Sequence, residues 1–304
     1  MLRPLEVNVM IIIMQSNEPH QESDHQQANH RTPRRSRQVP GQGNSIRSTV
    51  RITGIAKNTV TKLLVDIGAA CSAYQITAMV NLPCKRVQVD EIWSFVGCKQ
   101  KNVKDEDRGE LGRGDVWTWT AICADTKLVP CWCVGDRDAD YAHAFISDLA
   151  ARLANRVQLT SDGHKPYLQA VEDAFGWDID YAMLVKHYGS APETPNTRYS
   201  PAVCTGCDKQ IVKGDPDPKH VSTSYVERQN LTMRMKMRRF TRLTNAFSKK
   251  LENHECAIAL HFMHHNFCRI HQTLKSTPAI KSGITDHVWT IEEMVDLLRV
   301  YNLA

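Results

Sequence analysis

The sequence has no apolar run long enough to cross a bilayer and no recognisable signal peptide. Its most apolar stretch, residues 7–14, is far shorter than the roughly 20 residues that a membrane-spanning helix needs. Ten cysteines are present, and without a secretory leader they fit reduced thiols in a cytoplasm better than a disulfide framework. We therefore expect a cytoplasmic protein with no membrane partner, associated with the nucleoid if it binds DNA.

Acidic residues are missing from two stretches that are rich in lysine and arginine. Residues 31–62 hold eight Lys/Arg and no acid, and residues 223–250 hold eight Lys/Arg against the single Glu227. The net charge of +5 is modest, so the distribution of charge is more informative than the total. Two basic blocks on an otherwise balanced chain predict contact with a polyanion at two places.

The length of 304 residues allows one large core and a small appended module. Residues 15–44 are polar and rich in Pro, Gln and Arg, and they show no apolar period. Such a composition cannot bury a core. We expect residues 1–43 to be a disordered or atypical extension.

Residues 44–75 have the pattern of a helix–turn–helix DNA-binding module, with Gly54 in the turn. Apolar residues recur at helical spacing on both sides of this glycine. The second helix would present short polar and basic side chains able to reach phosphates and base edges. These are Lys57, Asn58, Thr59, Thr61 and Lys62. An ordinary helical hairpin with a solvated basic face is the alternative.

From residue 85 onward the pattern predicts an α/β fold with a mixed sheet. Strands are expected at 86–96, 116–124, 128–134, 157–160 and 179–185, and helices at 139–154, 167–175, 223–240, 247–270 and 291–300. This order matches a ribonuclease-H-like arrangement. We expect the catalytic core at 85–275, with residues 188–221 as a loop insertion, and a helical tail at 276–304.

Three carboxylates stand where a divalent-metal site could form. Asp90 and Asp162 lie at strand ends, and Glu227 lies on a basic helix. Two Mg²⁺ ions held by such oxygen ligands activate a nucleophile and neutralise a leaving oxygen in phosphodiester chemistry. Singly, they could be a strand-end residue, an Asp-Gly turn and a helical salt-bridge partner. Glu91 is expected to point to the opposite face of its strand.

The helix that carries Glu227 also places Asn230 and Arg234 on the same side, where they could steer a scissile phosphate. Its other basic residues are expected to contact the DNA backbone, although a solvated basic helix would look alike. They are Arg228, Lys236, Arg238, Arg239 and Arg242. His164 could equally touch a phosphate or pack at a helix start.

The pair Cys204 and Cys207 suggests zinc, but no second pair of Cys or His at ligand spacing accompanies it. A closed zinc site needs four ligands, so structural zinc is disfavoured. His261 and His265, four residues apart on a helix, are expected to pack against the core.

Five motifs in one order resemble the transposases of the bacterial insertion sequence 1 family, of the InsB type. The resemblance covers about residues 44–298. The motifs are Val-Asp-Glu-Ile-Trp-Ser-Phe (89–95), Gly-Asp-Val-Trp-Thr-Trp-Thr-Ala-Ile (114–122), Thr-Ser-Asp-Gly-His (160–164), Tyr-Val-Glu-Arg-Gln-Asn-Leu-Thr-Met-Arg (225–234) and Asn-Phe-Cys-Arg-Ile-His-Gln-Thr-Leu (266–274). Residues 1–43 depart from the helix-forming lead-in of that family.

The resemblance implies a DDE-type transposase that uses Mg²⁺ or Mn²⁺ to cut and join DNA ends. The three acidic positions of the family fall on Asp90, Asp162 and Glu227. Expected partners are the terminal inverted repeats of the element, target DNA and further copies of the chain. A catalytically impaired family member that only binds terminal repeats, and a nuclease that only hydrolyses, are the competing hypotheses.

Overall fold

The computed structural model describes residues 45–189, 204–241 and 244–302. The expected extension at 1–43 and the expected DNA contact Arg242 lie outside these described residues. Among the residues that the structure describes, no helix combines the length and apolarity needed to span a bilayer. All ten cysteines lie in the described ranges, and all are free thiols.

The expected helix pair is present at the start of the described chain. Helix α2 (Ile46–Thr53) begins at Ser45, whose side chain accepts a hydrogen bond from the Ser48 amide, and it ends at Gly54 with φ +74°. A left-handed residue at this position ends a helix most cheaply when it is glycine. Helix α3 (Lys57–Ala78) follows at once, so two consecutive helices with a short turn between them lie in the segment where the sequence pattern predicts a helix–turn–helix.

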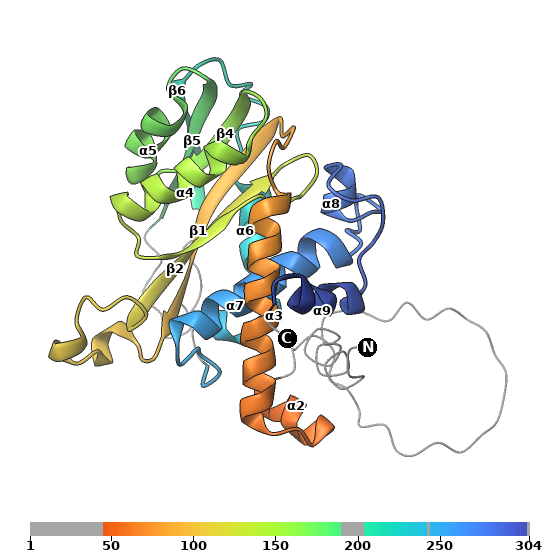
Figure 1. Cartoon of the computed structure of the whole chain (residues 1–304). Coiled ribbons are helices and arrows are strands. Elements are labelled where there is room, and N and C mark those ends of the chain that lie inside the picture. Colours follow the sequence, from red (N-terminus) through yellow and green to blue (C-terminus); the bar gives the residue numbers. More distant parts are fainter. Residues whose placement is uncertain (1–44, 190–203, 242–243, 303–304) are drawn as a thin grey trace, which may run out of the picture.

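Helix α3 is longer than the sequence pattern indicates, and its C-terminal part belongs to the main body. The interpretation of 44–75 as a separate module is therefore incomplete, because α3 packs against α7 (Leu251–Met263) and α9 (Ile291–Val300). Its residues Leu64, Ile67 and Cys71 enter the large core. Figure 1 shows α3 as one straight helix running from α2 to the sheet.

The close approach of α3 to α7 depends on Gly68. A Cβ atom at this position would lie 2.5 Å from Cβ of Cys256 and 2.6 Å from the Cys256 carbonyl oxygen. Backbone cannot move aside as a flexible side chain can, so any larger residue must push the two helices apart.

We expect Gly68→Ala to lower the free energy of unfolding by about 1–3 kcal/mol, the usual cost of overpacking. Urea unfolding of the full chain measures this change. Gly206→Ala is the matched control, because nothing lies within 4 Å of a Cβ built at Gly206. Equal effects of the two substitutions would contradict the close-packing explanation.

Six strands form one mixed sheet in the order β3-β2-β1-β4-β5-β6. Strand β1 pairs antiparallel with β2 and parallel with β4; β5 is parallel to β4, and β3 and β6 are antiparallel to β2 and β5. The bounds are β1 Arg86–Val96, β2 Gly114–Cys123, β3 Trp132–Gly135, β4 Val157–Asp162, β5 Ile179–Tyr188 and β6 Cys204–Lys213.

The sequence pattern missed β6, which lies inside the stretch 188–221 that was expected to be a loop insertion. Strand β6 pairs with β5 at the sheet edge, and nearly all of its residues are exposed. Without a buried face, the strand has no apolar alternation to reveal it. Residues 190–203 of the same stretch lie outside the described chain.

Helix positions agree with expectation, but two long helices are shorter than expected. Helices α4 (Ala139–Arg152), α5 (Pro166–Phe175) and α9 lie where the apolar period placed them. The expected helix 223–240 divides into α6 (Ser224–Lys236) and the short turn η4 (Arg238–Phe240), and 247–270 divides into α7 and η5 (His264–Cys268). The remaining short elements are η2 (Gln100–Asn102), η3 (Asp105–Asp107) and α8 (Pro278–Lys281).

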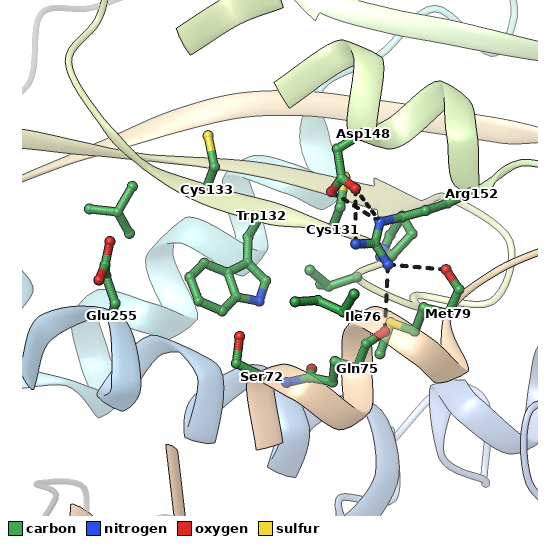
Figure 2. Close-up of a pocket in the computed structure, with 13 residues that line it drawn as sticks. Ser72, Gln75, Ile76, Met79, Cys131, Trp132, Cys133, Asp148, Arg152 and Glu255 are labelled. Atoms are coloured by element: carbon green, nitrogen blue, oxygen red, sulfur yellow. Dashed lines mark hydrogen bonds and ion pairs between the residues drawn. The ribbon is translucent and has the colours of Figure 1, made fainter. Parts of the chain in front are cut away.

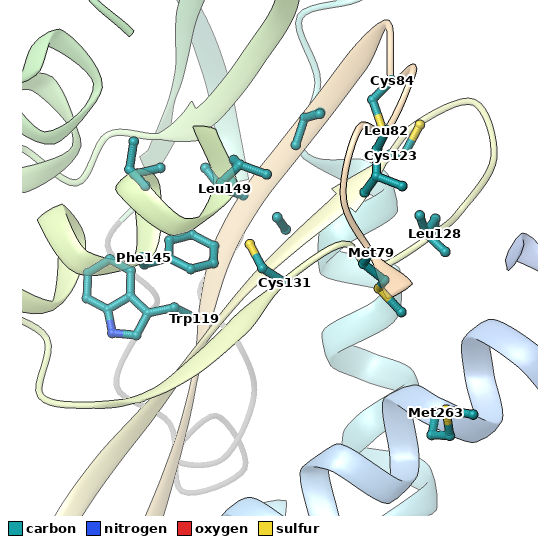
Figure 3. Packing of buried hydrophobic residues seen from close by; sticks show 14 of the residues in the cluster. Met79, Leu82, Cys84, Trp119, Cys123, Leu128, Cys131, Phe145, Leu149 and Met263 are labelled. Atoms are coloured by element: carbon teal, nitrogen blue, oxygen red, sulfur yellow. The ribbon is translucent and has the colours of Figure 1, made fainter. Parts of the chain in front are cut away.

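Helices cover both faces of the sheet. Helices α4 and α5 lie on one face (Figure 1), where Phe145 and Tyr167 pack on the fully buried Trp119. On the other face, Val226 of α6 and Phe262 of α7 pack against the middle of β1 and β2. Figure 3 shows how the large core continues from the α4 face to Met79 and Met263 near α3 and α7. The sheet is therefore held between two helical layers.

Trp117 and Trp119 share one face of the sheet, as the alternation predicts. They lie two residues apart on β2, and their partners Trp93 and Glu91 lie two residues apart on β1. Of these tryptophans only Trp119 is fully buried, and Trp93 and Trp117 are half-buried.

Buried histidines lie along α7 and η5, as expected for His261 and His265. His254 is fully buried between the hydroxyl groups of Ser94 (3.1 Å) and Ser248 (2.9 Å). Burial, reinforced by the charge of Arg239, lowers the pKa of His254 to about 3. Burial also lowers the pKa of His264 to about 3 and that of His265 to about 4.

These histidines make the fold sensitive to acid. A histidine with a lowered folded-state pKa takes up its proton only on unfolding, so its stabilisation is complete above pH 6.5 and is lost as pH falls toward 3 or 4. Each contributes a slope of about 1.4 kcal/mol per pH unit in this window. Urea unfolding at pH 7, 6 and 5 should show the slope, and His254→Asn should reduce it while His143→Asn, at an exposed position, should not.

Candidate active site

The candidate active site lies where β1 and β4 separate. The two parallel strands pair from Arg86 and Gln158 to Gln88 and Thr160. Asp90 and Asp162 each lie two residues beyond the last pair, so both carboxylates sit at the opening between the strands. One oxygen each from Asp90, Asp162 and Glu91 lies within 4.8 Å of the others. The structure therefore brings together two of the three expected acids and one unexpected acid.

Asp90 is fixed from the α6 side of the sheet. Nδ2 of Asn230 donates a hydrogen bond of 2.9 Å to Oδ2 of Asp90. Burial, followed by the negative charges of Glu91 and Asp162, raises the pKa of Asp90 to about 7, although Asn230 partly opposes the shift. The site thus holds more negative charge than its surroundings neutralise, which favours a proton or a cation.

Glu91 corrects the expectation that it would be remote from the site. Its backbone position does face the other side of the sheet from Asp90. This face also carries Trp119, the residue of β2 that pairs with Glu91. However, its carboxylate reaches the same cluster, because β4 no longer pairs with β1 at this level. Burial and then Asp162 raise the pKa of Glu91, while Tyr167 and Arg137 oppose the shift.

Arg137, in the connection between β3 and α4, links two acids of the cluster. Its Nε donates to Oε2 of Glu91 at 3.1 Å, and its Nη2 lies 3.7 Å from Oδ2 of Asp162. The guanidinium also lies over the ring of Trp117, 5.0 Å from the ring centroid. Arg137 is therefore the nearest positive charge that the structure supplies to these two carboxylates.

Asp162 stays partly accessible, with 34% of its side chain exposed. Its Oδ1 accepts a hydrogen bond of 2.9 Å from the amide of His164, which closes the turn after β4. The His164 ring packs at 5.9 Å from both Trp119 and Tyr167, and burial, followed by Arg137, lowers its pKa. Of the two roles considered for His164, the structure shows the packing one.

Glu227 is not part of the compact acid cluster in this conformation. It lies in the first turn of α6, where it forms an ion pair with Lys186 of β5 and accepts a hydrogen bond from the hydroxyl of Thr223. The pKa of Lys186 is raised: burial lowers it, but the Glu227 hydrogen bond and charge outweigh that effect. Asn230, one turn further along α6, is the α6 residue that contacts Asp90.

Gln88 positions α6 on the sheet, and sequence reasoning did not identify it. Its side-chain oxygen accepts hydrogen bonds from the amides of Tyr225 (2.8 Å) and Val226 (3.2 Å). These amides at a helix start would otherwise lack partners. Because Gln88 precedes Asp90 by two residues on one strand, the period of two was a signal that could have placed both on one face.

The expected DNA contacts fall into two groups. On α3, Lys57, Asn58 and Thr59 are exposed, whereas Lys62 pairs with Asp66 at 2.5 Å and Thr61 donates to the Lys57 carbonyl. On α6 and η4, Arg228, Arg234 and Arg238 are exposed, and Lys236 is half-buried.

Arg239 is better explained as a structural residue than as a backbone clamp. Its Nη1 donates to Oγ of Ser248 (3.0 Å) and to the carbonyl of Asn253 (2.8 Å). Burial lowers the pKa of Arg239 to about 10. The guanidinium is thus committed to bonds inside the protein and ties η4 to the start of α7.

A cavity of about 490 Å³ lies away from the acids, between α3, β3, α4 and α7. Figure 2 shows Arg152 at its wall, bonded to Asp148 and to the carbonyls of Gln75 and Met79. These bonds tie α4 to the end of α3, which accounts for the buried charge. Cys131 and Cys133 also line this cavity, while Cys204 and Cys207 are exposed on β6. Among the described residues, the one group of three or more potential metal ligands is the acidic cluster.

No family model matches the sequence, and no curated protein matches it. Among solved structures, the chain is similar to the piggyBac transposase in a synaptic complex with hairpin DNA, with a TM-score of 0.37 and 10% identity. The match covers 85% of this chain and 59% of the other, so the chain spans less than two thirds of that protein's length. At this TM-score the similarity carries no argument about activity, which must come from the geometry.

Proposed function

We propose that this protein is a DNA transposase of the DDE type, of the insertion sequence 1 family, with a ribonuclease-H-like core. Asp90, Asp162 and Glu227 are its proposed catalytic acids and ligands of Mg²⁺ or Mn²⁺. The observation that supports this most is the convergence of Asp90 and Asp162 where the parallel strands β1 and β4 stop pairing, Asp90 inside β1 and Asp162 at the end of β4. Far apart in sequence, the two carboxylates meet only because of the fold.

The sheet supports the proposed core type. Five strands in the order β3-β2-β1-β4-β5, with β2 reversed against the other four, form the arrangement that the strand–helix order predicts. The acids lie at the carboxyl ends of β1's paired part and of β4, where open α/β sheets place their sites.

The residues present fit a hard divalent cation. All three atoms in the cluster are carboxylate oxygens, the ligands that Mg²⁺ and Mn²⁺ prefer. Burial, and after it the charges of Glu91 and Asp162, raise the pKa of Asp90 to about 7. A bound divalent ion would supply Lewis-acid stabilisation of the charge that develops at the scissile phosphate.

The protein's own groups would orient the acids. Asn230 fixes one oxygen of Asp90, and the His164 amide fixes one oxygen of Asp162, whose other oxygen lies 3.7 Å from Nη2 of Arg137. Lys186 neutralises Glu227. Glu227 would become a ligand only in competition with this ammonium group.

The proposed partners are terminal inverted repeats and target DNA. Lys57, Asn58, Thr59, Thr61 and Lys62 on α3 are the proposed reading residues, and Arg228, Asn230, Arg234, Lys236, Arg238, Arg239 and Arg242 were expected from sequence on the catalytic side. Of these, Arg239 is better assigned to structure, as above. Because transposition joins two ends, we propose a homo-oligomer on DNA, in the cytoplasm at the nucleoid.

A second candidate function is terminal-repeat binding without catalysis. The ion pair between Lys186 and Glu227 favours it, because a third acid held by a lysine leaves the metal site short of one ligand. Such a protein would keep the α3 surface and lose only the chemistry.

A joining assay with the full chain tests the proposal. The substrate is the DNA that flanks its own gene, with Mg²⁺, Mn²⁺ or a chelator. Joined products that require metal support the transposase. Cleavage without joining would indicate a nuclease, and binding without either product would indicate the second candidate.

A further inference from the structure

Glu91 is a buried acid that the proposed three-acid site does not use. Only 1% of its side chain is exposed, and its Oε1 accepts no hydrogen bond of normal geometry among the described residues, where the buried Tyr167 hydroxyl and Arg137 are the groups that act on this carboxylate. We infer that Glu91 is a fourth acidic ligand of the divalent-metal site, alongside Asp90 and Asp162. The inference rests on the proposed metal-dependent function and adds a residue outside the three expected acids.

Charge balance at the cluster supports a divalent ion. Ionised Asp90, Glu91 and Asp162 carry three negative charges within 4.8 Å, and Arg137 offsets one of them. Lys186 is bound to Glu227. A buried carboxylate without sufficient compensation costs several kcal/mol. A divalent cation at this point, together with Arg137, would balance the three negative charges of these acids.

Two unpartnered oxygens provide an independent sign of a missing ligand. Besides Oε1 of Glu91, Oδ1 of Asn230 is buried without a partner, while the Nδ2 of the same side chain holds Asp90. Counted as whole residues, backbone included, Glu91 is 8% exposed and Asn230 is 6% exposed. Buried oxygens normally have partners, so a pair of orphaned acceptors beside three carboxylates points to a cation.

A purely structural salt bridge explains Glu91 less well. An arginine and a carboxylate that form a purely structural ion pair frequently make two parallel hydrogen bonds. Here Arg137 donates to Oε2 of Glu91 alone and turns its Nη2 toward Asp162. Oε1 of Glu91 therefore receives no hydrogen bond from Arg137.

Mn²⁺ binding to the full chain without DNA, measured by electron paramagnetic resonance or calorimetry, tests the inference independently of activity. We expect Glu91→Gln to weaken Mn²⁺ binding by at least about 10-fold, since even outer groups of metal sites contribute 10- to 100-fold. The matched control is Glu172→Gln, which removes an acid of α5 that pairs with Lys213 of β6 and is not a member of the acidic cluster; it should leave the Kd unchanged.

Arg137→Met separates a ligand from an anchor. If Glu91 binds metal, removing the competing guanidinium should leave Mn²⁺ affinity equal or higher. If Glu91 serves only to anchor Arg137, the two variants should weaken binding alike, and that result would overturn the inference. Should Glu91→Gln fail to fold, Glu91→Asp keeps the charge on a shorter side chain, and wild-type affinity in that variant would also overturn it.

Variants of Asp90 and Asp162 distinguish a wrong role for Glu91 from a wrong proposed function. Asp90→Asn and Asp162→Asn should abolish Mn²⁺ binding whatever Glu91 does. If they do so while Glu91→Gln binds as wild type, only the role of Glu91 is wrong. If wild type itself binds no Mn²⁺, the proposed metal-dependent function fails first, and the role of Glu91 fails with it.

Discussion

Asp162→Asn is expected to abolish metal-dependent strand transfer while the protein still binds terminal DNA. The substitution keeps the side-chain shape and the hydrogen bond to the His164 amide but removes the charge that would hold the cation. A bound metal stabilises the transition state by several kcal/mol, and each 1.4 kcal/mol is tenfold in rate. The joining rate should therefore fall by at least about 1,000-fold.

The matched control is Asp296→Asn, at an exposed acid on α9. It should join DNA at the wild-type rate. End binding, measured by fluorescence anisotropy, should be equal in all three proteins. Residual joining near the wild-type rate in Asp162→Asn would remove Asp162 from the site, and the convergence with Asp90 would then need another explanation.

The second large effect is expected at the exposed start of α3. Lys57→Ala together with Asn58→Ala should weaken binding to the terminal DNA by about 10- to 100-fold or more. An amide that reads a base contributes about 1–3 kcal/mol of discrimination, and a lysine on a phosphate contributes about one unit of the salt dependence. Both side chains are exposed at the amino-terminal end of the helix.

Anisotropy at two salt concentrations, with terminal and scrambled duplexes, separates the two contributions. The lysine change should weaken both duplexes and flatten the salt dependence, whereas the asparagine change should affect the terminal duplex alone. Lys104→Ala, at an exposed lysine paired with Glu106 outside α3, is the control. Equal loss with all three substitutions would mean that the chain attracts DNA by charge without reading it.

Sequence reasoning located elements whose burial repeats with a period. The amphipathic α4 and α9 leave a pattern because one face of each packs on the core. Asp90 and Asp162 could be found because each follows a short apolar run in the sequence. Asp162 does end β4, whereas β1 continues beyond Asp90 to Val96.

What the sequence did not reveal depends on contacts between distant segments. Strand β6 exists because β5 offers an unpaired edge, and its own residues carry no buried face. Glu91 follows the alternation rule in its backbone, but the rule says nothing about where a long side chain goes when the neighbouring strand departs. Arg239 looks like its basic neighbours until Ser248 and Asn253 take up its hydrogen-bond donors.

Because α3 is unbroken, the distance between its two ends is fixed. Its 22 residues, at a rise of about 1.5 Å each, span about 33 Å, which corresponds to about ten base pairs, or one turn, of duplex. One end of this helix carries the proposed reading residues, and the rest packs against α7 and α9, with Gly68 at the close approach to α7. In the proposed transposase, a duplex lying along this helix would be read at a fixed number of base pairs from the bond that is cut. Each residue added to the helix would shift this number and rotate the reading end by about 100°.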